Sequence, residues 1–319
     1  MIYRKKNKDI PYDKLRLHSS ERNVNWSDKL FTDFIKTISQ DDIKYYPNLE
    51  GVYQKLKDHY NTDDIIVGLG SDRCIEYFYQ INQGKEVLLV NPSYPMYEVH
   101  GKIHKNVIKF VDYNNLKFPV KEYIKNIKEN TICVFSNPSS PIGDIISRND
   151  IIDILNTGVP VLVDEAYIEF SDEKSVIELI PQYSNLYVTR TFSKAYGSAG
   201  IRLGIIASQK ENVERMFSYR PVFEINSFTA KWSSLLVDNF HEVENYVKDV
   251  KFVKSEVVKL LKNLSHDVID SNCNWVHVKG IKNLPENAVF KENCTIPGDS
   301  DGWVRLQITS DLKDYNWIV

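Results

Sequence analysis

A lysine within a run of small residues is the first feature of this sequence that could do chemistry. The run covers residues 193–204 and reads Ser-Lys-Ala-Tyr-Gly-Ser-Ala-Gly-Ile-Arg-Leu-Gly, just after a predicted strand. A lysine that enters a cleft can form a Schiff base with an aldehyde, once desolvation or a nearby cation lowers the pKa of its ammonium from about 10.4. Ser193 and Arg202 could bind a phosphate group. The alternative for Lys194 is a surface residue in a glycine-rich loop.

A second candidate, Asp164, closes the strongly apolar strand Pro160–Val163. A carboxylate at that position is partly buried, and its burial costs free energy unless a cation lies beside it. The cation could be a protonated ring nitrogen, a metal ion or an arginine. A metal is disfavoured because no second cluster of Asp, Glu or His accompanies Asp164 at ligand spacing, and we predict no metal site. A helix N-cap is the alternative role for this aspartate.

Two loops add polar residues at other predicted strand ends. The turn Gly70-Ser71-Asp72 leads into a helix, whose free N–H groups and serine hydroxyl could bind an anion. An ordinary N-cap is the alternative there. The loop 137–143 reads Asn-Pro-Ser-Ser-Pro-Ile-Gly, and its two prolines and glycine make it a rigid loop that holds polar side chains in place. The alternative for this motif is an ordinary turn.

The combination of these residues predicts a cofactor. Lys194 offers an amine for an aldehyde, and Asp164 offers a carboxylate for a pyridinium nitrogen. Ser71 and Arg202 offer donors for a phosphate. Pyridoxal phosphate (PLP) needs these three functions in one site, so the sequence predicts that the chain binds PLP.

The elements that must position these residues follow an alternating strand and helix pattern. Several predicted strands are apolar on both faces, which is typical of a sheet covered by helices on each side. Ligands bind such sheets at the carboxyl ends of the strands, where the candidate residues stand. The predicted strands are Ile65–Leu69, Glu86–Val90, Val107–Phe110, Thr131–Phe135, Pro160–Val163, Leu186–Arg190 and Leu203–Ala207. Helices are expected around Asp72–Gln80, Met96–Lys102 and Arg148–Asn156.

The pattern changes after about Pro221. Apolar residues at steps of three and four predict one long helix from Trp232 to Leu264, followed by short strands around Trp275–Val278 and Val304–Ile308. We therefore predict three parts. Residues 1–40 are a segment that packs with a small domain, 41–225 are a large PLP-binding domain, and 226–319 are the small C-terminal domain.

Composition narrows the class of protein. The 319 residues carry 40 basic and 43 acidic side chains, a net charge of −3 that does not favour nucleic acid or an anionic membrane as partner. The apolar runs are too short to span a bilayer. The four cysteines form no CxxC pair and suggest free thiols in a reducing compartment. We expect a cytoplasmic protein.

Motifs between about residues 15 and 312 resemble those of the fold-type I PLP enzymes, aminotransferase class I and II. Within them the chain is most similar to the histidinol-phosphate aminotransferase group. The runs at Lys194 and Asp164 match the elements SKAxxxAGxRxG and DEAYxEF of that group. The other similar elements are Gly70-Ser71-Asp72, Asn91–Tyr97, Tyr45-Tyr46-Pro47, Ser20-Glu21-Arg22 and Arg305.

The resemblance implies a fold and a role for each matched residue. The fold would be α/β, with a mostly parallel seven-stranded sheet in the large domain and a smaller α+β domain. Lys194 would hold PLP and move the proton between substrate Cα and cofactor C4′, while Asp164 would keep the pyridine nitrogen protonated. Further cofactor contacts would come from Tyr94 at the ring face, Tyr167 and Ser140 at O3′, and Ser71, Asp72, Ser193 and Arg202 at the phosphate. Arg305 and Glu21 would bind substrate. Tyr46 would reach the phosphate of the neighbouring subunit's cofactor, which implies a homodimer.

Some matched residues have ordinary structural alternatives. Tyr94 and Tyr97 could be core aromatics, and Arg305 could pair with Asp299 or Asp301 at the surface.

The chain also departs from the family pattern. Ser140 stands where the family has an asparagine, and Ile142 where it has a threonine. Residues 291–295 lack the Arg-Asp pair that serves the substrate phosphate in histidinol-phosphate enzymes, which argues against histidinol phosphate as the substrate. Lys291, Arg22 and Arg220 are the candidate replacements for that anion site.

The leading function is an aminotransferase for a small amino acid or phosphorylated amino compound, with an amino donor and a keto acceptor as partners. The alternative is a PLP-dependent decarboxylase of phosphorylated serine or threonine, since substrate contacts decide which Cα bond breaks. A non-catalytic binding or regulatory protein is a third option. The intact Lys194, Asp164 and Arg202, and the lack of an appended DNA-binding domain, argue against it.

Overall fold

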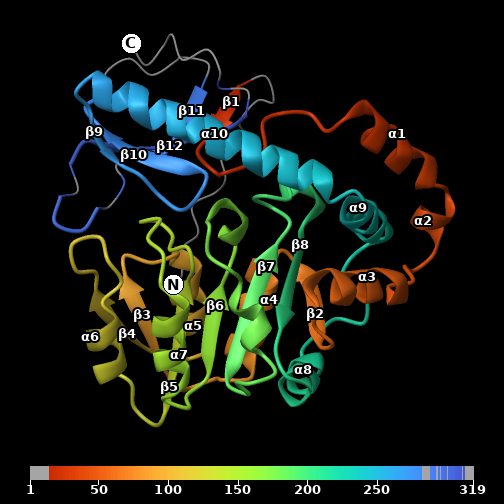
Figure 1. Ribbon diagram of the computed structural model, residues 1–319. Helices are drawn as coiled ribbons and strands as arrows, with labels where there is room; N and C mark the ends of the chain where they lie inside the picture. The colour runs from red at the N-terminus through yellow and green to blue at the C-terminus, as the bar shows by residue number, and fades with distance from the viewer. Residues whose placement is uncertain are drawn as a thin grey trace.

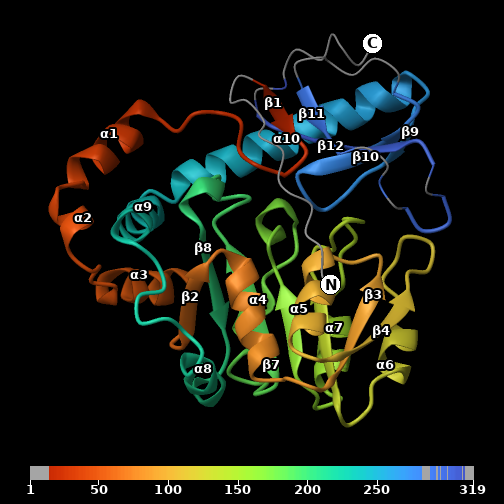
Figure 2. The same ribbon diagram turned by 180° about the vertical axis from the view of Figure 1, so that it is seen from behind.

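Figures 1 and 2 show the computed structural model as a large sheet with helices on both faces, beneath a smaller sheet that packs against the long helix α10. The structure describes residues 14–281, 288–291, 294, 296–299, 301–310 and 312. Among the described helices, none is both long enough and apolar enough to cross a membrane.

The large sheet has seven strands in the order β2-β8-β7-β6-β5-β3-β4. Strand β8 is antiparallel to both of its neighbours, and the other pairs are parallel. The predicted mostly parallel seven-stranded sheet is therefore confirmed. The strands are β2 (Ile65–Leu69), β3 (Glu86–Asn91), β4 (Val107–Asp112), β5 (Thr131–Ser136), β6 (Val161–Asp164), β7 (Leu186–Thr191) and β8 (Leu203–Ala207).

Apolar residues on both faces of these strands explain why helices cover the sheet twice. Successive strand residues point to opposite faces, so Cys133 and Phe135 of β5 enter one hydrophobic cluster while Ile132 and Val134 enter another. The helices of the second cluster are α4 (Ser71–Gln80), α5 (Pro95–Ile103) and α8 (Lys210–Phe217). The first cluster includes α3 (Glu50–Tyr60), α6 (Val120–Lys125) and α7 (Arg148–Leu155). It also includes residues of the N-terminal segment and of the C-terminal part above the sheet.

Two smaller sheets lie beyond the large one, and one of them joins the N-terminal and C-terminal segments of the chain. Strands β9 (Asp267–Ile269), β10 (Trp275–Lys279) and β12 (Trp303–Gln307) form an antiparallel sheet with β10 in the middle. Beside it, β1 (Leu15–Leu17) pairs in parallel with β11 (Ala288–Phe290). The pairing brings the N-terminal segment against the C-terminal part. The remaining elements are α1 (Asp28–Thr37), α2 (Asp41–Lys44) and the 3-10 helices η1 (Ile168–Phe170), η2 (Val176–Leu179) and η3 (Ala199–Ile201).

The predicted long helix Trp232–Leu264 is wrong as a single element. The chain forms α9 (Ser227–Asp238) and α10 (His241–Asn263), separated by Asn239 and Phe240. Asn239 leaves helical geometry with φ −114° and ψ 38°, and its side chain donates to the carbonyl of Leu235. The Phe240 ring then packs 4.6 Å from His59 and 5.5 Å from Tyr196, centroid to centroid. These contacts with α3 and with the loop after β7 stabilise the break between α9 and α10, although the apolar spacing continues through it.

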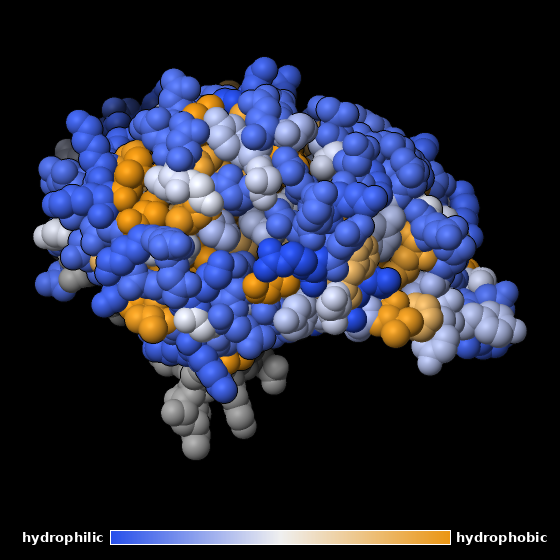
Figure 3. All heavy atoms as spheres, turned by 90° about the horizontal axis from the view of Figure 1, so that it is seen from below, coloured by the Kyte–Doolittle hydropathy of each residue, from blue (hydrophilic) through white to orange (hydrophobic). Residues whose placement is uncertain are grey.

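The lower face of the molecule is mainly polar (Figure 3). Figure 3 views the molecule from below and shows a mostly hydrophilic face with separate hydrophobic patches.

Candidate active site

A cavity of about 510 Å³ lies between the carboxyl ends of the large sheet's strands and the smaller sheet. It is lined from below by the ends of β5 and β6 and by the starts of α4 and α5, and from above by Ser19, Lys291, Cys294 and Arg305. Seven of the residues to which the resemblance gave a catalytic, cofactor-binding or substrate-binding role line it: Ser71, Tyr94, Ser140, Asp164, Tyr167, Lys194 and Arg305. The parallel strands end at the same edge of the sheet, so motifs that are far apart in the sequence come together there.

Lys194 follows β7 and presents its amine to the cavity. Its Nζ donates a hydrogen bond to the carbonyl of Ser19 at 2.7 Å and lies 5.6 Å from the centroid of the Tyr167 ring. Tyr167 is held in turn by an edge-on contact with Trp275, at 4.6 Å between centroids. The amine is therefore positioned by groups from both parts of the molecule, and it is not the surface lysine of the alternative interpretation.

Asp164, the last residue of β6, is only 4% exposed. Its Oδ2 accepts from the Tyr97 hydroxyl at 2.8 Å, and its Oδ1 accepts from the Thr189 hydroxyl at 3.0 Å. Burial raises the pKa of this carboxyl to about 6, against the opposing effect of the two hydroxyl donors; nearby Asp72 raises it further. No described cationic side chain forms an ion pair with it. A protonated ring nitrogen fits this unpaired buried carboxylate.

The turn before α4 is built for an anion. Gly70 has φ +80° and is the N-cap of α4, with no side chain capping the helix, so the Ser71 hydroxyl is not used as a cap. The amides of the first helical turn lack helical partners and can donate to an anion. A Cβ on Gly70 would collide with the guanidinium of Arg202, and one on Gly204 would collide with the backbone of Ser71. Both glycines let the turn lie close to Arg202 and β8.

Arg202 and Ser193 complete this turn from the other side. Arg202 has φ +60°, and its Nη1 lies 3.3 Å from the Ser193 hydroxyl and 3.2 Å from the carbonyl of Ala199. Asp72 accepts a hydrogen bond from the Tyr94 hydroxyl at 3.0 Å. The donors expected for a phosphate thus lie together around the turn at Ser71, which lines the cavity, although Asp72, Ser193 and Arg202 themselves do not line it. The residues present fit PLP.

The opposite end of the cavity is cationic. Arg305 is 4% exposed, donates from Nη2 to the carbonyl of His18 at 2.7 Å, and lies over the Trp275 ring with Cζ 4.7 Å from the centroid. Its Nε has no hydrogen-bond partner among the described residues. The surface pairing considered for Arg305 is wrong, because Asp299 pairs with Lys279 instead.

Lys291 adds a second positive charge at this end. Loss of hydration in the cavity wall, together with the charges of Arg305 and Lys194, lowers the pKa of its ammonium to about 8. Of the three replacements considered for an anion site, only Lys291 lines the cavity. Arg22 stacks 3.8 Å over the Trp26 ring, and Arg220 pairs with Glu224 at 2.8 Å.

Tyr46 and Glu21, two further predicted residues, neither line the cavity of their own chain nor contact the turn at Ser71. Tyr46 is 80% exposed and stacks on Phe223 with 4.3 Å between the ring centroids. Glu21 forms an ion pair with Arg16 at 2.7 Å, and its backbone carbonyl accepts from Gln307. Its predicted role in substrate binding stays a prediction.

Sequence reasoning missed other groups at the site. Thr189 and Ser19 each make one hydrogen bond that only the fold reveals, and no signal in the sequence marked them. Tyr97 was noticed only as part of a tyrosine motif. It is fully buried, as the core alternative has it, but its hydroxyl serves Asp164. Ser140 lines the cavity as predicted, and its backbone N–H donates to Ser136 Oγ at 2.9 Å.

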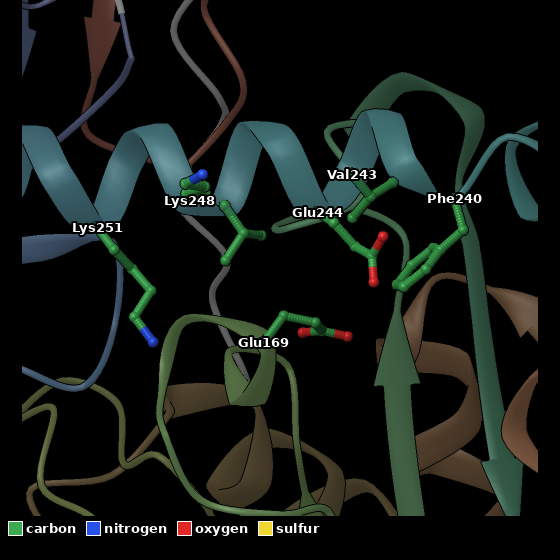
Figure 4. A pocket seen from close by; sticks show the side chains of 7 residues that line it. Glu169, Phe240, Val243, Glu244, Lys248 and Lys251 are labelled. Carbon is green, nitrogen blue, oxygen red and sulfur yellow. The ribbon is translucent and has the colours of Figure 1, made fainter.

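A second hollow of about 520 Å³ lies between α10 and the η1 region (Figure 4). Val243 and Phe240 provide its apolar wall, and the carboxylate of Glu169 reaches into it. Two of its charged groups are already paired within the chain, Glu169 with Arg190 and Lys251 with Asp172. It has no buried carboxylate without a cation, so it lacks the chemistry of the first cavity.

Comparison with known proteins agrees with this geometry. A sequence model of the family "Aminotransferase class I and II" matches residues 13–311. A histidinol-phosphate aminotransferase from Clostridium novyi is 29% identical over 295 residues, covering 86% of this chain and 82% of the relative. The structure of the histidinol-phosphate aminotransferase from Sinorhizobium meliloti, in complex with pyridoxal-5'-phosphate, superposes with a TM-score of 0.83 at 17% identity, covering 93% of this chain and 87% of the other.

The L-threonine-O-3-phosphate decarboxylase from Porphyromonas gingivalis has the same fold, with a TM-score of 0.80 at 19% identity and coverage of 95% of this chain and 96% of the other. The family match spans nearly the whole chain, and the cavity contains the lysine, the buried carboxylate and the anion turn that PLP needs. The chain therefore belongs to the aminotransferase class I and II family, and it is an aminotransferase that uses pyridoxal phosphate.

Proposed function

We propose that the protein transfers an amino group from a small donor with a carboxylate or phosphate group to a keto acceptor. The observation that carries this proposal is the single cavity shared by the Lys194 amine, the buried Asp164 carboxylate and the cationic pair of Lys291 and Arg305. The first two groups suit the cofactor, and the pair suits an anionic substrate. The relatives named histidinol-phosphate aminotransferase support the same class of substrate.

Bound PLP supplies an electron sink that stabilises negative charge at the substrate Cα. Asp164 would pair with the protonated ring nitrogen, and the hydroxyls of Tyr97 and Thr189 would hold its carboxylate in place. The Lys194 amine would take the proton from the substrate Cα and deliver it to C4′ of the cofactor. Its neighbours favour this role, because Ser19 and Tyr167 keep the amine at the centre of the cavity.

The remaining cofactor contacts are proposed from the residues gathered around the cavity. The phosphate would be bound by Ser71, the amide of Asp72, Ser193 and Arg202, and Tyr94 would stack on the ring. Tyr167 and Ser140 would lie at O3′. Each of these assignments rests on the family motif and on the placement described above.

Arg305 would bind the substrate carboxylate or phosphate, since its planar guanidinium is held by Trp275 and His18 with Nε left to donate. Lys291 would add a second contact to the same or a further anionic group. With its pKa at about 8, Lys291 is charged below that pH and loses its charge above it. Binding of a doubly anionic substrate should therefore weaken as the pH rises above about 8.

The test is to offer the purified PLP enzyme a panel of amino donors and follow conversion of the cofactor to its pyridoxamine form. The panel includes simple amino acids, dicarboxylic amino acids, phosphoserine, phosphothreonine and histidinol phosphate. Lys291→Met should raise KM for donors with a second anionic group by about tenfold or more, because a hydrogen bond to a charged group is lost. The change in kcat should be smaller. Lys279→Met is the matched control, because Lys279 pairs with Asp299 at the surface. If no donor converts the cofactor, the proposed activity is wrong.

Decarboxylation of a phosphorylated amino acid is the second candidate. The cationic pair of Lys291 and Arg305 could bind the phosphate of such a substrate as well as a carboxylate. The same incubations distinguish the two functions, because decarboxylation of phosphoserine or phosphothreonine releases CO₂ and leaves the cofactor in its PLP form. CO₂ release without formation of the pyridoxamine form would replace the first proposal by the second.

We also propose a homodimer whose cavities are completed by the partner's Tyr46. Apolar side chains of residues 31–46 and 222–223 are 40% to 80% exposed: Phe31, Ile35, Ile43, Tyr45, Tyr46, Val222 and Phe223. Such a group of exposed apolar side chains is typical of a surface that another protein covers.

The dimer can be tested by mixing two inactive variants. Lys194→Ala lacks its own amine, and Tyr46→Phe lacks the hydroxyl proposed to serve the neighbouring site. In a mixed dimer, the Tyr46→Phe protomer keeps Lys194 and receives an intact Tyr46 from its partner, so one normal site returns. Tyr45→Phe is the matched control, with 67% exposure beside Tyr46. Absence of any gain on mixing, or full activity in a monomer, would contradict the shared site.

Two broader proposals remain. The division into residues 1–40, 41–225 and 226–319 is supported by the separation of the seven-stranded sheet from the three-stranded sheet and by the pairing of β1 with β11. A cytoplasmic location is supported by Cys74, Cys133, Cys273 and Cys294, which are all buried free thiols.

A further inference from the structure

A cluster of metal-ligating side chains lies outside the catalytic cavity. Glu76 is on α4, while His100 is on α5 and His104 follows the end of that helix. The two helices pack against each other on one face of the large sheet, as both ribbon views show. None of the three residues lines the PLP cavity.

The ligand atoms of the three side chains already converge. One ring nitrogen of each histidine and one carboxylate oxygen of Glu76 all lie within 4.8 Å of one another. His104 Nε2 and Glu76 Oε1 are 3.7 Å apart, which is too long for a hydrogen bond. In a tetrahedral site with bonds of about 2.1 Å, ligand atoms lie roughly 3.4 Å apart. Closing the cluster around an ion therefore needs side-chain movements of about 1 Å or less.

The histidine spacing also favours a metal. Residues four apart lie on the same face of a helix, and two histidines at this spacing are a common zinc-binding pair. The Tyr79 ring lies 6.0 Å from the His100 ring and 6.5 Å from the His104 ring, with interplanar angles of 31° and 23°. Tyr79 thus supports both imidazoles from one side and limits their rotation.

The state of each ligand suits coordination. The His104 side chain is only 10% exposed, and its Nε2 has no hydrogen-bond partner among the described residues. Glu76 uses Oε2 to accept from Arg73 Nη1 at 2.7 Å and leaves Oε1 facing His104. Arg73 thereby orients the carboxylate, as outer groups do at metal sites, although its charge weakens cation binding.

We propose that Glu76, His100 and His104 bind one Zn²⁺ per chain. Two imidazoles and one carboxylate favour zinc over magnesium or calcium, and a water molecule would be the fourth ligand. The ion would join α4 to α5, the helices that begin at Ser71 and just after Tyr94. This zinc would have a structural role, because its ligands stand outside the cavity.

The test uses the untagged PLP enzyme, treated with a chelator and then titrated with Co²⁺ and Zn²⁺. One Co²⁺ per chain should bind with the visible absorption of a four-coordinate nitrogen and oxygen site, and Zn²⁺ should displace it. His104→Gln and Glu76→Gln should each weaken binding by about tenfold or more, while exposed His241→Gln should not. Zn²⁺ should also raise the thermal midpoint of the unaltered protein but not of the two ligand variants.

Cofactor loading and the far-ultraviolet spectrum identify a variant that fails to fold, and the more conservative Glu76→Gln then carries the test. Binding that is unchanged in both ligand variants would overturn the proposal, as would the lack of tight binding in the unaltered protein. A cobalt spectrum with thiolate bands that disappear in Cys294→Ser would assign the metal to the catalytic cavity and would also overturn it.

Discussion

Removing the charge of Asp164 should make the protein freed of PLP more stable at neutral pH, while it damages the enzyme. Burial raises the pKa of Asp164 from 3.8 to about 6. The folded state therefore holds the proton more tightly than the unfolded chain does. The stability that this gives is fully present below pH 3.8 and is lost as the pH rises through about 6. The total loss corresponds to about 3 kcal/mol.

The assay is urea unfolding of the PLP-free protein and of Asp164→Asn at several pH values. Asparagine has the same shape but does not titrate, so the difference between the two proteins isolates this carboxyl. Relative to the variant, the unaltered protein should lose roughly 1.4 kcal/mol between pH 5 and 7.5, about half of the total change. Bound PLP should remove this loss, because its ring nitrogen supplies the missing cation. The Asn variant should still bind PLP but lose most of its activity.

A difference that stays constant across this pH range would refute the reasoning. It would mean that Asp164 ionises in the folded protein as it does in the unfolded chain. The hydroxyls of Tyr97 and Thr189, or water, would then offset the cost of burial completely. Near-normal turnover by Asp164→Asn would separately show that the carboxylate does not serve the ring nitrogen.

Three further predictions concern single groups of the cavity. Lys194→Ala should leave no cofactor attached to the chain after borohydride reduction, and peptide mass spectrometry that finds it on another lysine would contradict the assignment. Tyr97→Phe removes a hydrogen bond to a charged acceptor of about 1.5–3 kcal/mol, so PLP should bind about tenfold or more weakly in a spectroscopic titration; a change below twofold would argue against this bond. Ser140→Asn should lower the pH midpoint of the lysine-bound cofactor's visible absorption by up to about one to two units, and an unchanged midpoint would mean that Ser140 does not reach the ring.

The strand ends were the most predictable part of this protein. Continuous apolar strands force a sheet that is covered on both faces, and parallel strands deliver their carboxyl ends to one edge. Asp164, Ser71 and Lys194 could be assigned to one site for that reason. The motif resemblance then added Arg305, which no periodic pattern would have brought to the cavity.

Contacts between distant segments could not be predicted. Ser19 and Lys194 are 175 positions apart, and their hydrogen bond depends on how the N-terminal segment crosses the cavity. Arg22 also comes from that segment, yet its guanidinium stacks on an aromatic ring instead of entering the cavity. The break between α9 and α10 escaped the periodic pattern because Phe240 fits both a helix stripe and the packing around His59. In each of these cases packing between distant segments determined the structure, because the local sequence was compatible with more than one arrangement.

The tight contact between Gly204 and the turn at Ser71 has a consequence for how this enzyme can change over time. Any codon change that replaces Gly204 adds a Cβ, and that atom meets backbone, which cannot rotate away. Gly200, only four positions earlier, faces open space and meets nothing within 4 Å. A library of random variants selected for growth should therefore contain many residues at position 200 and almost only glycine at position 204. Substitutions that change the substrate would then have to occur among the residues that line the cavity from above, while the contact between Gly204 and the turn at Ser71 stays unchanged.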